Sequence, residues 1–233
     1  MPAQGEFGKR LSAAADLVRP GAVFADIGTD HASLPIYLAS VGKIKRAYAC
    51  DVAEKPVELA RKNVDASGYS DIIEVRLTDG FCGLRGLSLT DAAVCGMGGE
   101  LIAALLSAED ARFLRAESVR LILQPMSRAA YLRRYLASEG FEIETEVIVR
   151  DMGRQYELVC ATYTGNTYSL TPLEEQLGRA NIARGGEELA VLCRRRLTHL
   201  KNLLGGTRGK EREETLALIA ELERTEESII NKR

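Results

Sequence analysis

Residues 25–35, ADIGTDHASLP, place two carboxylates around a single glycine. The stretch follows an apolar run and precedes a helical pattern, which is where parallel sheets bind nucleotides. A dinucleotide would need three glycines and no carboxylate beside its pyrophosphate, but Asp30 and Ser33 occupy the second and third glycine positions of that motif. The residue types therefore argue against a phosphate-bearing ligand.

S-adenosylmethionine (SAM) suits the same charges. It carries a sulfonium and an ammonium and has no phosphate, so Asp26 and Asp30 become favourable neighbours. Gly28 would let the backbone approach such a ligand closely. The loop therefore predicts SAM as the cofactor, with Asp26 and Gly28 among the residues that bind it.

The rest of this loop has two readings. Pro35 suits the first turn of a helix, so we expect the helix to begin with Ser33 as its N-cap. Thr29, Asp30 and His31 then face the ligand, and we predict Thr29 and His31 as cofactor contacts. An aspartate here is also common as a simple cap, and His31 suits either a contact with ligand or RNA or a packing role.

Two more carboxylates end the next strand-like runs. Asp51, followed by Val52, can accept hydrogen bonds from both ribose hydroxyls. Asp79, followed by Gly80, can accept from the adenine amino group. Each alone fits an ordinary turn. Together with Asp26, however, they make three acidic strand ends in one sheet, which predicts a nucleoside site. We expect Asp51, Val52, Asp79 and Gly80 to bind the cofactor there.

Residues 95–102, CGMGGELI, follow the fourth apolar run and form the acceptor side. The loop lacks the Asn/Asp-Pro-Pro-aromatic segment that grips an exocyclic amine, and it lacks a Cys-Pro pair for attack on a pyrimidine. Adenine N1 needs neither, because its lone pair attacks without losing a proton. We predict Asp30, Gly96 and Met97 as catalytic residues, with Asp30 either stabilising the charge on the methylated ring or accepting a proton from its amine. Gly96 is also a predicted cofactor contact.

The elements that position these residues alternate along the chain. Strand-like runs cover 22–27, 46–51, 72–77, 92–95 and 119–124, and helical spacing covers 54–67, 100–106 and 128–139. This alternation predicts a parallel sheet with helices on both faces. Two final runs, 141–151 and 155–164, predict an antiparallel hairpin. The fold class is therefore α/β, with a Rossmann-like, seven-stranded sheet.

The pattern changes after residue 165. In 187–204, apolar residues recur every three or four positions, GGTRG at 205–209 breaks the helix, and a second amphipathic helix follows. The apolar positions are Leu189, Cys193, Leu197, Leu200 and Leu204 in the first helix and Leu218, Leu222 and Ile229 in the second. We predict a SAM-binding domain, 1–165, and a helical domain, 166–233, built on an antiparallel coiled-coil pair.

Composition narrows the choice of compartment and partners. The formal net charge is −2, so any nucleic-acid surface must be a local patch. The five cysteines show no CxxC spacing, and with only two histidines no metal site is expected. Residues 1–18 lack signal-peptide features, and no stretch is apolar enough to span a membrane. These features predict a cytoplasmic protein that does not bind membranes.

Basic residues supply candidate patches for RNA. One group lies in the segment CRRRLTHLK and a second follows the fifth strand-like run. We predict RNA contacts at Arg194, Arg195, Arg196 and Lys201 in the first group and at Arg128, Arg133 and Arg134 in the second. From the residues alone, the first group fits slightly better a solvated helix face balanced by the acidic KEREE of the following helix, whereas the family resemblance described next favours RNA contacts.

Several motifs together resemble the bacterial tRNA (adenine-22-N1)-methyltransferases. They are ADIGTDHASLPIYL, VRLTDGF, CGMGGELI, LILQPM and GFEIETEVIVRDMGRQYEL, in that order over about residues 8–163. The resemblance implies a class I methyltransferase fold, SAM as donor, and tRNA as substrate, with methylation at adenine 22. It also implies that SAM lies against Asp26, Gly28, Asp51, Asp79 and Gly96.

Two alternatives remain open from the sequence. One is a SAM-dependent methyltransferase that acts on a small molecule. The other is a non-catalytic SAM-binding RNA adaptor that recruits partners through its helices. For the oligomeric state we expect a monomer or a weak homodimer.

Overall fold

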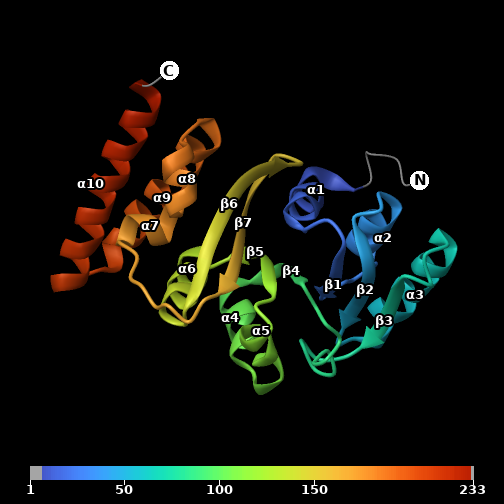
Figure 1. The fold of residues 1–233 in the computed structure, drawn as a ribbon. Helices are drawn as coiled ribbons and strands as arrows, with labels where there is room; N and C mark the ends of the chain where they lie inside the picture. The colour runs from blue at the N-terminus through green and yellow to red at the C-terminus, as the bar shows by residue number, and fades with distance from the viewer. Residues whose placement is uncertain (1–6, 232–233) are drawn as a thin grey trace. The chain divides into compact units, whose positions relative to one another are not determined.

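The computed structural model describes residues 7–231, and its contacts divide the chain into two compact units (Figure 1). The first unit runs through Tyr168 and the second begins at Ser169. The division into a SAM-binding domain, 1–165, and a helical domain, 166–233, stays a prediction, because a compact unit in the contacts is not the same as a domain with its own function. Their outer ends, residues 1–6 and 232–233, lie outside the described part of the chain.

The first unit is built on one seven-stranded sheet. The strands are β1 (Ala22–Ile27), β2 (Ile44–Asp51), β3 (Ile73–Leu77), β4 (Asp91–Gly98), β5 (Arg120–Ser127), β6 (Phe141–Asp151) and β7 (Arg154–Tyr163). Their order is β3-β2-β1-β4-β5-β7-β6. β1 to β5 are parallel, and β7 runs antiparallel to both β5 and β6. The predicted α/β sheet with a closing hairpin is confirmed.

Helices cover both faces of this sheet (Figure 1). They are α1 (Gly8–Leu17), α2 (Ser33–Ser40), α3 (Glu54–Ser67), α4 (Gly99–Ser107), α5 (Phe113–Ala116) and α6 (Ala129–Ser138), with a short 3-10 turn η1 (Glu109–Ala111). Residues of α1, α2 and α3 join one buried cluster, and those of α4, α5 and α6 join the other. Two cores therefore flank the central strands.

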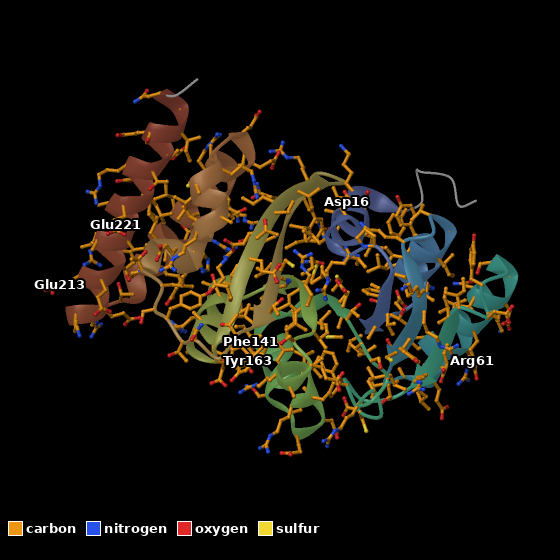
Figure 2. All side chains as sticks on the ribbon, in the orientation of Figure 1. Asp16, Arg61, Phe141, Tyr163, Glu213 and Glu221 are labelled. Atoms are coloured by element: carbon orange, nitrogen blue, oxygen red, sulfur yellow. The ribbon has the colours of Figure 1, made fainter. Side chains whose placement is uncertain are left out.

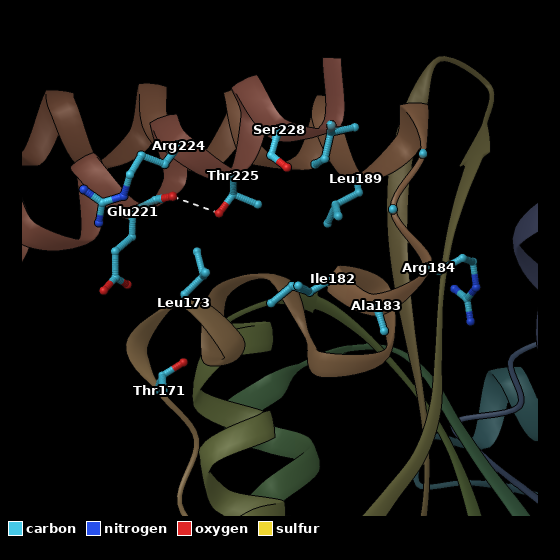
Figure 3. A pocket seen from close by; sticks show the side chains of 13 residues that line it. Thr171, Leu173, Ile182, Ala183, Arg184, Leu189, Glu221, Arg224, Thr225 and Ser228 are labelled. Atoms are coloured by element: carbon cyan, nitrogen blue, oxygen red, sulfur yellow. Dashed lines mark hydrogen bonds between the residues drawn. The ribbon is translucent and has the colours of Figure 1, made fainter. Parts of the chain in front are cut away.

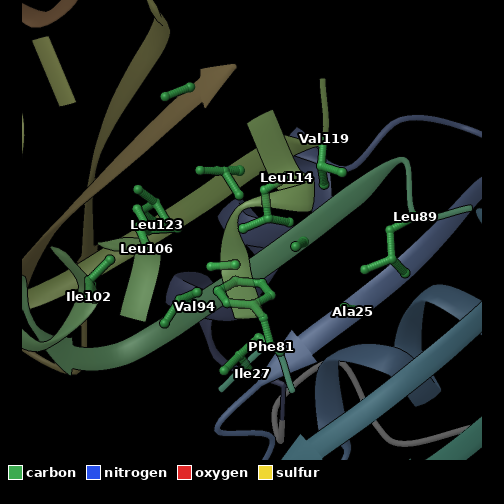
Figure 4. Packing of buried hydrophobic residues seen from close by; sticks show 14 of the residues in the cluster. Ala25, Ile27, Phe81, Leu89, Val94, Ile102, Leu106, Leu114, Val119 and Leu123 are labelled. Atoms are coloured by element: carbon green, nitrogen blue, oxygen red, sulfur yellow. The ribbon is translucent and has the colours of Figure 1, made fainter. Parts of the chain in front are cut away.

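Alternation along β1 explains the two cores. Phe24 belongs to the cluster on one face, and Ala25 and Ile27 belong to the cluster on the other. Figure 4 shows the second cluster, where Ile102 of α4 lies near the central strands. At the far edge, the rings of Phe141 and Tyr163 meet edge to face at 5.3 Å (Figure 2).

The second unit is helical. It contains α7 (Pro172–Leu177), α8 (Arg179–Arg184), α9 (Glu187–Leu203), a 3-10 turn η2 (Leu204–Gly206) and α10 (Gly209–Asn231). The start of α7 has a capping box between Thr171 and Glu174.

Helices α9 and α10 form an antiparallel hairpin. Arg194 pairs with Glu226 at 2.9 Å, and Lys201, further along α9, pairs with Glu223, earlier in α10, at 2.7 Å. Leu222 of α10 is buried, as are three of the predicted apolar positions of α9, Leu189, Cys193 and Leu197. The predicted helix pair is confirmed, whereas its coiled-coil packing stays a prediction.

Candidate active site

The candidate site lies at the carboxyl end of β1, where the strand order reverses between β1 and β4. The loops that follow the first strands are joined by backbone hydrogen bonds. The N–H groups of Gly28 and Thr29 donate to the carbonyl of Cys50, at 2.8 and 2.9 Å, and the N–H of Thr78 donates to the carbonyl of Asp51 at 2.8 Å. The sheet thus brings three loops to one edge.

Asp26 is the buried carboxylate of this edge, with 5% of its surface exposed. Its Oδ2 accepts a hydrogen bond from the hydroxyl of Thr29 at 2.6 Å. Burial raises the pKa of Asp26 to about 6, although the Thr29 hydrogen bond and the charge of Arg10 oppose the rise. Asp26 therefore lies buried beneath the loop, where it is hydrogen-bonded to Thr29.

The next carboxylate, Asp30, is exposed and lies in a left-handed backbone conformation with φ 51°. Its Oδ2 lies 3.1 Å from Nε2 of His31, and the carbonyl of His31 accepts a hydrogen bond from the Asn63 side chain. Both side chains stand at the mouth of the loop, where an approaching substrate could reach them.

The expected N-cap at Ser33 is wrong. α2 begins at Ser33 itself, and the N-cap is Ala32, which has a left-handed conformation and makes no side-chain cap bond. The chain turns through left-handed residues before the helix instead of ending in a serine cap. Pro35 is therefore the third helical residue.

The predicted nucleoside contacts lie on the neighbouring loops. Asp51 ends β2, and its Oδ1 accepts a hydrogen bond from the N–H of Ala53 at 2.9 Å. Val52 beside it is 68% exposed, and Asp79 is exposed after β3. Gly80 follows directly. Carboxylate oxygens at adjacent strand ends fit the hydroxyls, amine and positive charges of SAM.

The acceptor loop leaves β4 through a bulge. Cys95 pairs with Gln124 and Met97 with Pro125, so Gly96 is the extra residue. Gly99 starts α4 under a close backbone contact, because a Cβ there would lie 2.5 Å from the carbonyl oxygen of Arg128. This close contact with the turn after β5 leaves no room for a Cβ, which explains why the last residue of the CGMGG segment is a glycine.

Two residues of this edge were missed by the sequence reasoning, Arg10 and Gln124. Nη1 of Arg10 donates to Oε1 of Gln124 at 2.8 Å, and the N–H of Gly96 donates to the same oxygen at 3.2 Å. Arg10 comes from α1, whose first turn is held by the Asp151 carboxylate through the Arg10 N–H. A capping acceptor so distant along the chain leaves no local sequence signal.

One predicted RNA contact is contradicted by the structure. Arg133 is fully buried, with Nε 2.6 Å from Glu146 Oε1 and Nη2 3.0 Å from Glu157 Oε2. It neutralises two carboxylates of the closing hairpin and cannot reach a phosphate. The neighbouring candidates Arg128 and Arg134 are exposed, as an RNA contact requires.

The helical unit carries the other basic candidates. Arg194 and Lys201 are exposed but paired with glutamates of α10, and Nε of Arg196 donates to the backbone carbonyl of Gln176. Arg195 is exposed on the same helix. The balancing carboxylates are Glu223 and Glu226, further along α10 than the KEREE segment.

A cavity of about 780 Å³ also lies within this unit, among α7, α8, α9 and α10. Apolar side chains such as Leu173, Ile182 and Leu189 line it, and Arg184, Glu221 and Arg224 contribute polar groups (Figure 3).

Over residues 7–231, no cluster of three or more His, Cys, Asp or Glu could hold a metal ion. No helix in the same range is both long and apolar enough to cross a membrane.

The reversed strand order, the antiparallel β7 and the acidic strand ends define a methyltransferase of the Rossmann-like class. The family model described as "Methyltransferase domain" matches residues 7–159. The tRNA (adenine(22)-N(1))-methyltransferase of Bacillus subtilis is 37% identical over 153 residues. That match spans 66% of this chain and 63%, less than two thirds, of the curated relative.

Two solved structures extend the comparison over nearly the whole chain. Streptococcus pneumoniae Sp1610, solved with S-adenosyl-L-methionine, is 32% identical with a TM-score of 0.83, covering 94% of this chain and 98% of that one. TrmK of M. capricolum, solved with S-adenosyl-homocysteine, is 25% identical with a TM-score of 0.76, covering 97% and 98%. The chain belongs to the bacterial tRNA (adenine-22-N1)-methyltransferase family.

Proposed function

We propose that this protein transfers a methyl group from SAM to N1 of adenine 22 in tRNA. The observation that carries the proposal is the row of carboxylates, Asp26, Asp51 and Asp79, at adjacent strand ends beside Gly28. A cationic, phosphate-free nucleoside matches that row, and the names of the similar proteins support the substrate.

Each loop has a separate part in holding the donor. Asp51 binds the ribose hydroxyls and Asp79 the adenine amine, while the exposed Val52 packs against the nucleoside. Gly28 and Gly96 form the floor near the methionine end. Thr29 holds Asp26 by its 2.6 Å hydrogen bond, which keeps that carboxylate under the positive charges of the ligand.

The acceptor side manages charge and alignment. SAM supplies a methyl carbon on a cationic sulfur, and its transfer to the N1 lone pair leaves the adenine ring positively charged. Asp30 stabilises that charge from the mouth of the loop, with His31 3.1 Å away to orient it. Gly96 and Met97 shape the surface on which the base lies.

The partner in this proposal is tRNA. Arg128 and Arg134 contact phosphates on the first unit, and Arg194, Arg195, Arg196 and Lys201 do so on the second. The enzyme then recognises tRNA by shape and reaches a base taken out of its stack. We infer a cytoplasmic enzyme that is a monomer or a weak homodimer.

Labelled SAM and tRNA transcripts test the proposal. The protein should label a transcript with adenine at position 22 and release 1-methyladenosine on digestion, but it should not label a transcript with guanine there. Transfer to small molecules without RNA would favour the small-molecule enzyme. SAM binding without transfer to any RNA would favour the adaptor.

A further inference from the structure

Of the aromatic side chains within residues 7–231, Tyr131 in the first turn of α6 is the most exposed. It is 39% exposed, whereas the other tyrosines and the phenylalanines of that range are buried or half-buried. Scattered aliphatic side chains are normal on a protein surface, but a large ring in water leaves a flat stacking surface uncovered. The groups around this ring therefore indicate what it binds.

Tyr131 lies in the row of contacts between α4 and α6. At the start of both helices, Nε of Arg128 is 3.6 Å from Oε1 of Glu100, and further along them the hydroxyls of Ser107 and Tyr135 are hydrogen-bonded at 2.9 Å. Tyr131 follows Arg128 by three residues and precedes Tyr135 by four, so the three share one face of α6. Because α4 starts directly after the acceptor loop, the ring lies at the edge of the sheet where the methyl group is transferred.

The surroundings of the ring suit a nucleotide. The guanidinium carbon of Arg134 lies 5.8 Å from the centre of the Tyr131 ring, and Arg128 is exposed one turn before it. The exposed pair between Arg128 and Glu100 is weak enough for a phosphate to compete for the arginine. A ring can stack on a base while neighbouring cations meet the phosphates of the same strand.

The reaction creates a base that needs such a surface. Methylation at N1 takes adenine 22 out of its stack, which costs stacking energy and leaves the adjacent base without one of its neighbours. We propose that Tyr131 stacks on the base adjacent to adenine 22 after the adenine has left the stack. This inference rests on the proposed function, and it makes Tyr131 a positioning residue that stabilises the opened RNA.

A double-mutant cycle with three tRNA transcripts tests the stacking contact. One transcript is complete, and the others lack the base at the position before or after adenine 22. Tyr131→Leu keeps an apolar side chain but removes the ring. It should bind the complete transcript about tenfold more weakly than the wild type does, the range for one stacked base, and should lose nothing on one of the two abasic transcripts. Fluorescence titrations measure each affinity.

Matched variants separate stacking from a structural effect. Tyr131→Phe keeps the ring and should bind the complete transcript like the wild type. Leu59→Ala changes a side chain of α3 that is also 39% exposed, and it should bind all three transcripts like the wild type. Calorimetry should give one affinity for S-adenosylhomocysteine in the wild type and in Tyr131→Leu, because the ring acts on the RNA and not on the donor.

The outcomes distinguish this inference from the proposed function. If Tyr131→Leu binds the complete transcript as tightly as the wild type, or loses the same factor on all three transcripts, the ring does not stack on an adjacent base. If Tyr131→Phe loses as much as Tyr131→Leu, the hydroxyl is the active group and the inference is overturned. A wild type that methylates tRNA in either case leaves the proposed function standing, whereas one that methylates no tRNA overturns both.

Discussion

The terminal methyl of Met97 lies against Gly28, so closely that a Cβ on this glycine would overlap with it. The contact joins the loop after β1 to the bulge of β4, the two segments that carry the predicted donor and acceptor sites. Gly28 also has a φ of 76°, which disfavours any residue with a Cβ. The backbone conformation therefore favours glycine at this position, and a Cβ would also require the methyl at the end of the flexible Met97 side chain to move.

Gly28→Ala should weaken binding of S-adenosylhomocysteine at least tenfold, because the loop must shift or displace Met97. Calorimetry measures the loss. Gly68→Ala is the matched control, since Gly68 has a φ of 77° with open space around its Cβ position at the end of α3. It should cost about 1 kcal/mol of stability and leave ligand affinity unchanged. Equal affinities for the wild type and Gly28→Ala would contradict the proposed site.

Asp30→Ala should lower turnover on tRNA by about a hundredfold while changing the affinity for SAM less than threefold. The reason is that Asp30 is expected to act on the charge of the methylated adenine and not on the donor. Single-turnover methylation and calorimetry separate the two effects. Parallel losses in both measurements would make Asp30 an ordinary ligand of SAM.

Asp26 should make the stability of the ligand-free protein fall as the pH rises from about 4 to about 6. Its pKa is raised by burial from 3.8 to about 6, so in this range the folded state binds a proton that the unfolded state does not. The stabilisation is complete below 3.8 and lost above about 6, and a pKa difference of about two corresponds to about 3 kcal/mol.

Urea unfolding between pH 4 and pH 7 measures this effect. Asp26→Asn should remove the decline, whereas Asp16→Asn, an exposed carboxyl on α1, should keep it. Superimposable pH profiles for Asp26→Asn and the wild type would show that Asp26 is ionised to the same extent in both states.

Arg133→Met should lower the free energy of unfolding by about 3–5 kcal/mol, because Glu146 and Glu157 would remain buried without their cation. Chemical denaturation gives the value. Arg134→Met, on the exposed side of α6, should cost less than about 1 kcal/mol. A small loss for Arg133→Met would mean that the hairpin opens to hydrate its carboxylates.

The ion pairs of α9 predict opposite effects on tRNA binding. Arg194→Gln should weaken binding and reduce the salt dependence by about one phosphate contact. Glu226→Gln should strengthen binding, because it releases Arg194 from its 2.9 Å partner. Fluorescence titrations at several salt concentrations measure both. Arg112→Gln, which breaks an exposed pair with Glu109 in the first unit, is the control and should have no effect. If neither α9 nor α10 variant changes affinity, this face does not bind RNA.

Local patterns were enough for most of the fold. The predicted helix 54–67 is α3, and the hairpin runs 141–151 and 155–164 became β6 and β7 within one residue. These elements are set by periodicity and turn residues that lie within a few positions of one another. α1 was not predicted, because its start depends on the distant Asp151 carboxylate.

The sequence by itself determined the class of ligand, because carboxylates that follow successive parallel strands must meet at one edge of the sheet. Tertiary structure alone decided which charged groups are available there. Packing buried Arg133 between two glutamates and brought Arg10 of α1 against Gln124 of β5. Burial and pairing depend on contacts between residues far apart in the chain, which the order of residue types does not specify.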